Sequence, residues 1–219
     1  MQFRARRWSA VTGAIVSFLV LTSTQAFAVE VDLLNTFTSP MSNTAYSVDN
    51  LGFEPAQSIA VSFVVPTNAS NDPWAITNIN TSISAQFGPV TLNLGIMADN
   101  GGRPSGTFLS SVTLTAGPDP LSIAALNWSI GGGAKYWFAV IAHNDDAQWI
   151  GSQLQGTFGF SSGDTWMTES GPLPGAQITG FETPLPGAFV LFASGLGGIG
   201  MLGVRGRKKA AQPALMRSI

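Results

Sequence analysis

The sequence predicts an all-β protein, a β-sandwich of jelly-roll or immunoglobulin-like type with a C-terminal transmembrane helix. Three observations support this prediction. Between residues 29 and 182, apolar and polar side chains alternate with a period of two, and helical periodicity is almost absent. Turn residues divide the same region into about ten short segments. After residue 182 follows an apolar segment without a charge, long enough to cross a bilayer as a helix.

The first three expected strands show the alternation most clearly. In the first, apolar side chains at positions 59, 61, 63 and 65 share one face, and small residues occupy the other. The pattern recurs from Ile79 to Phe87 and from Val90 to Met97. Such alternation is typical of antiparallel strands with one buried face. Pro66–Pro73 is typical of a polar loop and Gly88-Pro89 of a tight turn.

Further strands are expected along the rest of the region, at Thr107–Thr115, Leu121–Ile130, Lys135–His143 and Gln148–Ser152, with shorter ones near Thr165 and Ile178. Residues 99–104 are expected to connect a hairpin. Residues 135–142 are apolar on both faces, which indicates a central strand. About 150 residues are enough for one hydrophobic core. The rival all-β interpretation, an outer-membrane barrel, requires longer strands and no helical tail.

The composition excludes several classes of chemistry. Of 219 residues, 45% are hydrophobic and 10% charged, against roughly 25% charged in an average soluble protein, so disorder driven by charge is not expected. The absence of cysteine excludes disulfides, thiol nucleophiles and cysteine-based zinc sites. With one histidine, His143, sites built from several histidines are excluded too.

Charge is segregated along the chain, although the net charge is only −2. Between residues 29 and 182 lie all twelve acidic residues but only two basic ones, Arg103 and Lys135, which gives that region a net charge of −10. The other basic residues lie near the two ends. Because phosphate contacts need a basic face, a nucleic-acid-binding role is not expected.

Residues 1–28 have the features of a secretory signal peptide. A basic region, Met1–Arg7, precedes the apolar stretch Ala10–Leu21, and Ala26 and Ala28 occupy the positions that signal peptidase reads. We expect cleavage after Ala28 and export of residues 29–182 as the β-sandwich domain. The alternative is an uncleaved membrane anchor, which the short apolar stretch and the Ala-x-Ala site disfavour.

Residues 187–204 form the predicted transmembrane helix. These 18 uncharged residues would span about 27 Å, close to the roughly 30 Å of a hydrocarbon core. The basic residues that follow are Arg205, Arg207, Lys208 and Lys209. By the positive-inside rule they hold residues 210–219 in the cytoplasm and place the acidic middle outside. The alternative, a buried helix of a soluble domain, is disfavoured by six glycines in the segment.

The C-terminal region resembles a known sorting signal. The motif Thr183-Pro184-Leu185-Pro186-Gly187, the Gly-rich apolar segment and the basic stretch together resemble the PEP-CTERM signal, closest to the proteobacterial variant with the motif Val-Pro-Leu-Pro-Ala. Thr183 stands in place of Val and Gly187 in place of Ala. The resemblance covers residues 183–209. It implies export in a Gram-negative bacterium, recognition by an exosortase, cleavage near residues 184–187, and a surface or matrix location linked to exopolysaccharide and biofilm.

Residues 51–180 resemble a second family. The stretches that carry this resemblance are residues 56–63 (AQSIAVSF), 100–106 (NGGRPSG), 133–137 (GAKYW) and 148–149 (QW). They are similar to the choice-of-anchor R domain, which occurs on bacterial surface proteins with interchangeable anchoring tails. The resemblance implies a β-rich exported module and no established activity.

No catalytic constellation is recognisable in the sequence. A G-x-G-x-x-G match at residues 195–200 lies inside the predicted transmembrane segment and follows no strand. His143 has Asp145 and Asp146 nearby, but no Gly-x-Ser-x-Gly elbow is present. A carboxylate pair for glycoside hydrolysis stays open, because the sequence sets no separation between its twelve acids. We expect no catalytic residue and no cofactor.

Asp99, Asp145 and Asp146 are the candidate calcium ligands. Loops supply their carboxylates, but the EF-hand spacing is absent and turn formation by aspartate side chains explains the same residues. We therefore expect no metal site, with calcium as the alternative.

Trp149 and Trp166 are the candidate glycan contacts. Flat indole rings stack on sugars, and these two tryptophans lie beside loops and polar residues. Trp128 and Trp137 lie within apolar strands, where we expect them to pack in the core.

The sequence as a whole predicts an exported structural or adhesive protein of the cell surface or exopolysaccharide matrix, without enzymatic activity. The expected partners are signal peptidase, an exosortase, the inner membrane during transit and extracellular polysaccharide. A carbohydrate-binding module is the first alternative, and a secreted hydrolase is the second.

Overall fold

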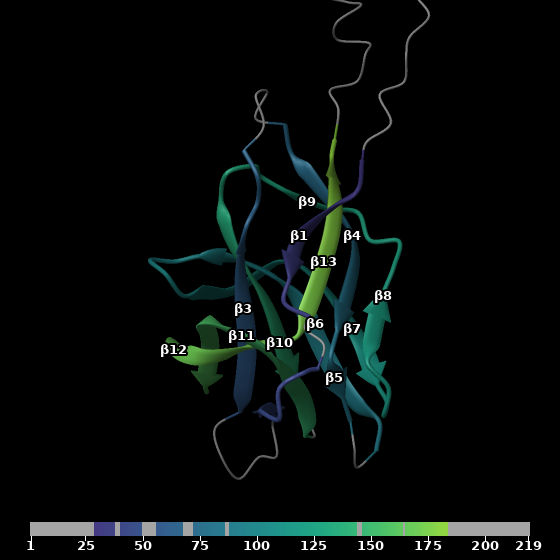
Figure 1. Ribbon diagram of the computed structural model, residues 1–219, viewed down its shortest axis with the longest axis vertical. Coiled ribbons are helices and arrows are strands. Elements are labelled where there is room, and N and C mark those ends of the chain that lie inside the picture. Colours follow the sequence, from purple (N-terminus) through teal and green to yellow (C-terminus); the bar gives the residue numbers. More distant parts are fainter. Residues whose placement is uncertain are drawn as a thin grey trace, which may run out of the picture.

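The computed structural model describes residues 29–37, 40–49, 56–67, 72–85, 88–143, 146–163 and 165–183. Within these ranges the chain forms strands and turns but no helix, which confirms the predicted all-β class there (Figure 1). The strands are β1 (Val31–Asn35), β2 (Ala45–Val48), β3 (Gln57–Val64), β4 (Trp74–Thr81), β5 (Ile83–Ser84), β6 (Val90–Asp99), β7 (Pro104–Ala116), β8 (Leu121–Ile123), β9 (Trp128–Ile130), β10 (Lys135–Ala142), β11 (Ala147–Ser162), β12 (Thr165–Pro174) and β13 (Ala176–Glu182).

The strands form two packed antiparallel sheets. The five-stranded sheet has the order β1-β13-β4-β8, and β9 also pairs with β4. The eight-stranded sheet has the order β12-β11-β3-β10-β6-β7, and β2 and β5 pair with β11. The described part of the chain is therefore sandwich-like in its layers.

The main hydrophobic core lies between the two sheets. Ile59, Phe138 and Leu94 contribute to it from the eight-stranded sheet, and Ile76 and Ile178 from the five-stranded sheet. Because burying one such side chain contributes roughly 1.5–3 kcal/mol, this cluster is a principal source of stability. As predicted, β10 is a central strand, since it pairs with β3 on one side and with β6 on the other.

A second, smaller cluster, the outer-face cluster, lies on the other side of the eight-stranded sheet and consists of Ala60, Met97, Trp137, Ala139 and Trp166. Gly95, Ala139, Ala60 and Gly159 are register partners across β6, β10, β3 and β11. The β6–β7 hairpin folds back over this row of small residues, and Pro104 lies so close to Gly159 that an added Cβ would come within 2.9 Å of its Cγ. Register shifts near the end of β6 accompany the bend (Figure 1).

β11, with 16 residues, changes partners along its length. Its first part, Ala147–Ile150, pairs with β2 and β5, whereas its later part, Phe158–Ser162, pairs with β3. Between the two parts, its register with β12 shifts from Gly151 to Gln155. Such an irregularity bends a strand, and it places β2 beside the edge formed by β11 and β12.

Several predicted strand boundaries are wrong. The expected strand Leu121–Ile130 is two short strands, β8 and β9, because Ala125 between them has a φ of 58°, a left-handed conformation that interrupts a strand. The expected strand Gln148–Ser152 is part of the longer β11. The short piece near Thr165 is the ten-residue edge strand β12, in which half of the residues are exposed and apolar alternation is weak.

The described chain enters and leaves at the same end of the molecule. Val31 lies beside Gly180, so β1 begins where β13 ends, at the top of the view in Figure 1. β4 begins beside the end of β13 and runs away from it to Thr81. Close to that far end, β2 and β5 pair with the first part of β11.

The predicted targeting segments lie outside the described residues. They are the signal peptide 1–28, the sorting motif Pro184, Leu185 and Pro186, the transmembrane segment 187–204, the basic residues Arg205, Arg207, Lys208 and Lys209, and the tail 210–219. In the part of the chain that the structure describes, no helix has the length and apolar character needed to cross a membrane.

Candidate functional site

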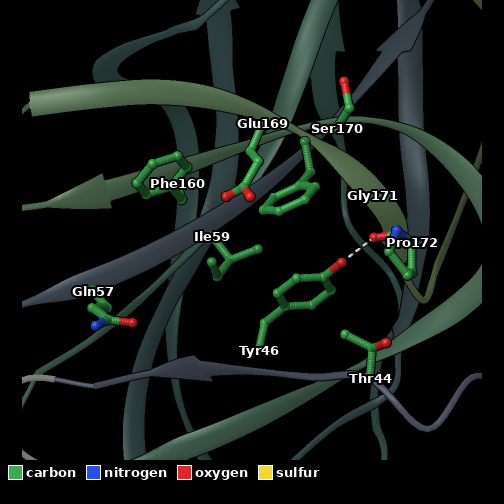
Figure 2. A pocket seen from close by; sticks show the side chains of 10 residues that line it. Thr44, Tyr46, Gln57, Ile59, Phe160, Glu169, Ser170, Gly171 and Pro172 are labelled. Atoms are coloured by element: carbon green, nitrogen blue, oxygen red, sulfur yellow. Dashed lines mark hydrogen bonds between the residues drawn. The ribbon is translucent and has the colours of Figure 1, made fainter.

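A pocket of about 350 Å³ opens at the edge of the eight-stranded sheet, where β2 approaches β11 and β12. Its volume is within the range of small-molecule sites. Strands β2, β3, β11 and β12 carry most of its lining (Figure 2). The lining residues are Thr44, Tyr46, Gln57, Ile59, Phe158, Phe160, Glu169, Ser170, Gly171 and Pro172.

Tyr46 forms one wall of the pocket. Its ring packs against Phe158 with ring centroids 4.8 Å apart and planes inclined by 50°. Its hydroxyl donates a hydrogen bond to the carbonyl oxygen of Pro172 (Figure 2). Because Tyr46 belongs to β2 and Pro172 to β12, this bond ties the edge strand to β2 and holds the tyrosine ring in place.

The Tyr46 hydroxyl stays protonated at neutral pH. Burial raises the pKa of Tyr46, and the negative charge of Glu169 raises it further. The phenol therefore remains a hydrogen-bond donor to Pro172 over the physiological range.

Glu169 supplies the carboxylate of the pocket lining. It is the register partner of Phe158, and directly opposed residues on neighbouring strands present their side chains on the same face. Figure 2 shows its carboxylate directed toward Ile59, on the same side as Phe160. No hydrogen bond or ion pair joins this carboxylate to another described residue. A ligand in the pocket would meet an unpaired negative charge.

Gly171 lets the aromatic wall approach the edge strand. A Cβ at this position would lie 3.3 Å from Cε1 of Phe158 and 3.7 Å from the Tyr46 hydroxyl oxygen. The first distance is tighter than an ordinary contact, so a larger side chain would press on the Phe158 ring.

The pocket suits a small ligand with one apolar face and polar edges. Phe160 is half-buried and, with Tyr46, offers aromatic surface, while Ile59 supplies apolar surface. Glu169 and Gln57 supply hydrogen-bonding groups. The lining contains one carboxylate, whereas glycoside hydrolysis ordinarily uses two flanking the scissile bond.

The structure places the predicted glycan contacts away from this pocket. Trp149 is 0% exposed, packs edge-on against Phe138 at a centroid distance of 5.5 Å, and donates from Nε1 to the carbonyl of Gly175 at 2.9 Å. Trp166 is 8% exposed and belongs to the outer-face cluster. Because protein encloses both rings, their burial argues against the predicted stacking of a sugar on either one.

The two tryptophans expected to pack in apolar surroundings do so. Trp137 is fully buried, although in the outer-face cluster and not between the sheets. Its Nε1 donates to a carboxylate oxygen of Asp99 at 2.7 Å. Trp128 is partly buried and packs against the main core.

The structure does not bring the described calcium candidates together. Asp99 ends β6 and pairs with Lys135, at the start of β10, at 3.5 Å. Asp146 lies beyond the other end of β10 and accepts a hydrogen bond from Ser47 at 2.7 Å. Asp145 lies outside the described residues. Over the ranges that the structure describes, no group of three or more acidic or histidine side chains is placed to hold a metal ion.

His143 follows the last residue of β10 and is exposed. Its backbone N–H donates to the carbonyl of Thr91 at 3.0 Å, which continues the pairing of β10 with β6 by one residue. This position is the end of a strand, as the sequence indicates.

Tyr46, Phe160 and Glu169 are absent from the sequence-based candidates. The spacing of Phe158 and Phe160 by two places both rings on one face of a strand, which is a weak signal available without the structure. Nothing in the sequence sets the register that brings Glu169 opposite Phe158, or the bend of β11 that brings Tyr46 to them.

No protein-family model matches this sequence, and neither curated proteins nor solved structures provide a match. The function is therefore inferred from the pocket together with the features of the sequence.

Proposed function

We propose that this chain is an exported cell-surface or extracellular-matrix protein with an adhesive role, and that its pocket binds a carbohydrate. The observation that carries this proposal is the placement of Tyr46, Phe160 and the unpaired Glu169 carboxylate around one open pocket. A pyranose ring has an apolar C–H face for the aromatic rings and hydroxyl groups for the carboxylate. In this proposal the protein adheres to its surroundings by binding carbohydrate in this pocket.

The proposed location of the protein is the surface or extracellular matrix of a Gram-negative bacterium, where it would be associated with exopolysaccharide and biofilm. Residues 1–28 and 183–209 support export and exosortase sorting through their resemblance to a signal peptide and to the PEP-CTERM signal. Within residues 29–182 we propose a β-sandwich of jelly-roll or immunoglobulin-like type. Tyr46 lies away from the end at which the described chain enters and leaves, so a tethered domain would present its pocket outward.

Substitutions at Phe160 test carbohydrate binding. Phe160→Leu removes the aromatic face and keeps apolar volume, while Phe160→Ala removes both. Loss of one stacked ring should weaken retention in native gels containing soluble polysaccharides by about three- to tenfold, the equivalent of roughly 0.5–1.5 kcal/mol. Leu109→Ala, which truncates an exposed side chain on β7, is the matched control. Unchanged retention of both Phe160 variants on every polysaccharide would rule out this contact.

The hydrolase alternative has a separate test. Incubation of the purified protein with a panel of glycosidase and esterase substrates should give no turnover. Turnover that Glu169→Gln abolishes would replace adhesion with catalysis as the role of this pocket.

Export is tested by mass spectrometry of the mature chain. We expect an N-terminus at Val29 and a C-terminus near residues 184–187. Reporter fusions after Glu182 and after Lys209 should report opposite sides of the membrane before sorting. Recovery of the chain with both ends intact in the cytoplasm would contradict the proposed location.

A further inference from the structure

We propose that the sugar unit bound in this pocket carries a protonated amine, which pairs with Glu169. This inference rests on the proposed glycan-binding function and specifies its substrate class, amino sugars with a free amino group. Three features support it: the Glu169 carboxylate has no cationic partner in the pocket, aromatic rings line the pocket, and a metal ion would find too few oxygen ligands there.

The charge of Glu169 has no counterpart in the pocket. None of the lining residues is basic. Residues 29–182 contain only two basic side chains, Arg103 and Lys135. Lys135 is engaged elsewhere, 3.5 Å from a carboxylate oxygen of Asp99 and 4.6 Å from the ring centroid of Trp137. Arg103 is exposed and is not part of the pocket lining. Among the described residues, no basic side chain is placed to neutralise Glu169 in the pocket, so we assign the pairing cation to the ligand.

The aromatic lining of the pocket also favours a positively charged ligand. Tyr46 lines the pocket and Phe160 lies beside Glu169, and the faces of aromatic rings attract cations.

The surroundings of Glu169 fit an organic cation better than a metal ion. Calcium takes about six to eight oxygen ligands, whereas the exposed Glu169 is the one carboxylate of the pocket lining. An amino sugar satisfies both parts of the site, because its ring carbons contact the apolar surface while its ammonium group reaches the carboxylate. A uronic acid would bring a second negative charge, which Glu169 repels.

The test compares four oligosaccharides of equal length by calorimetry, with the full-length chain purified in detergent. They are oligomers of glucosamine, N-acetylglucosamine, glucose and galacturonic acid. At about pH 5.5, where the sugar amine is protonated, the glucosamine oligomer should bind about tenfold more tightly than the neutral oligomers, and the acidic one most weakly. Raising the pH to about 9 deprotonates the amine and should remove the preference.

Glu169→Gln should bind the amine and neutral oligomers equally. Asp119→Asn, which removes the same charge from an exposed loop outside the pocket, should keep the preference. Glu169→Asp keeps the negative charge on a shorter side chain and should therefore keep part of the preference for the glucosamine oligomer. Equal affinities in the unmodified protein, or a preference that persists in Glu169→Gln, would overturn the amine inference and leave glycan binding standing. Absence of binding to every oligomer would overturn the proposed glycan site and the inference with it.

Discussion

The indole Nε1 of Trp149 donates a hydrogen bond of 2.9 Å to the carbonyl oxygen of Gly175. Gly175 is the single residue between β12 and β13, where the chain passes from the eight-stranded sheet to the five-stranded sheet. The Ser82 hydroxyl lies 3.1 Å from the same carbonyl and 2.6 Å from that of Ile150. This joint ties the two sheets together at the bend of β11.

Gly175→Ala should destabilise the protein by about 1–3 kcal/mol, because the joint has no room for another carbon. An added Cβ would come within 2.4 Å of Met41 Cε, 2.6 Å of the Ser82 hydroxyl and 3.1 Å of the Ile150 carbonyl. Gly117→Ala is the matched control, since nothing lies within 4 Å of a Cβ there. Chemical denaturation measures the free energy of unfolding of the two variants. Equal stabilities of Gly175→Ala and Gly117→Ala would contradict the close packing around Gly175.

Trp149→Phe should cost about 1–2 kcal/mol of stability, because it removes the hydrogen bond to Gly175 and part of the buried ring. Trp149→Ala should cost about 3–5 kcal/mol, so lost glycan retention in that variant would report unfolding. Retention of folded Trp149→Phe should equal that of the unmodified protein. Weaker retention at full folding would restore Trp149 as a glycan contact.

Gly159→Val should loosen the hairpin that covers the outer face, because its side chain would displace Pro104 from the sheet. We expect a destabilisation of about 1–3 kcal/mol and faster hydrogen exchange of the amides of residues 100–103 and 105–107. Thr157→Val, on an exposed side chain of the same strand, should leave both unchanged. Unaltered exchange in Gly159→Val would show that the hairpin is held by other contacts.

Asp99 should make stability depend on acid pH. Burial raises the pKa of Asp99, but hydrogen bonds from Gly102 and Trp137 and the charge of Lys135 outweigh it and hold the pKa below the ordinary 3.8. A depressed pKa means that the unfolded chain binds the proton more readily. The stabilisation by this carboxylate is therefore complete above the ordinary value and is lost as the pH falls through the depressed one.

Asp99→Asn tests this dependence. At neutral pH it should lower the free energy of unfolding by about 1–2 kcal/mol, given that the side chain is 23% exposed. The difference from the unmodified protein should shrink as the pH falls below the ordinary pKa of the carboxyl group. Asp119→Asn on an exposed loop should change stability by about 0.5 kcal/mol or less. A difference that stays constant into strong acid would refute the proposed linkage.

Much of the strand pattern was predictable because alternation reports burial directly. The faces expected for positions 59, 61 and 63 and for Val90–Ile96 are the core-facing sides of β3 and β6. The sequence-based expectation of one buried face was wrong for these strands, because Ala60 and Met97 on their other faces are buried too. The connection at residues 99–104 is where the β6–β7 hairpin turns, with Gly101 and Gly102 in the left-handed region that a tight connection requires. β12 was underestimated because an edge strand with exposed side chains carries little apolar signal.

The candidate site was far less predictable than the strands. Trp149 has polar neighbours in the sequence, yet the β12–β13 joint and Phe138 enclose it, and both come from other parts of the chain. The pocket residues Tyr46, Phe160 and Glu169 lie on three strands. They meet only through the bend of β11 and the register of β12.

The sequence by itself determined the all-β class and the apolar faces of its clearest strands, because hydrophobic periodicity is a local property that each segment carries alone. It also supplies the evidence for the predicted export signals at the two ends. The tertiary structure decided which aromatic rings are buried, where a pocket opens, and that the Glu169 carboxylate lines this pocket without a partner. Those outcomes depend on contacts between residues far apart in the chain, and such contacts are set only when strands find their register and the two sheets close over one core.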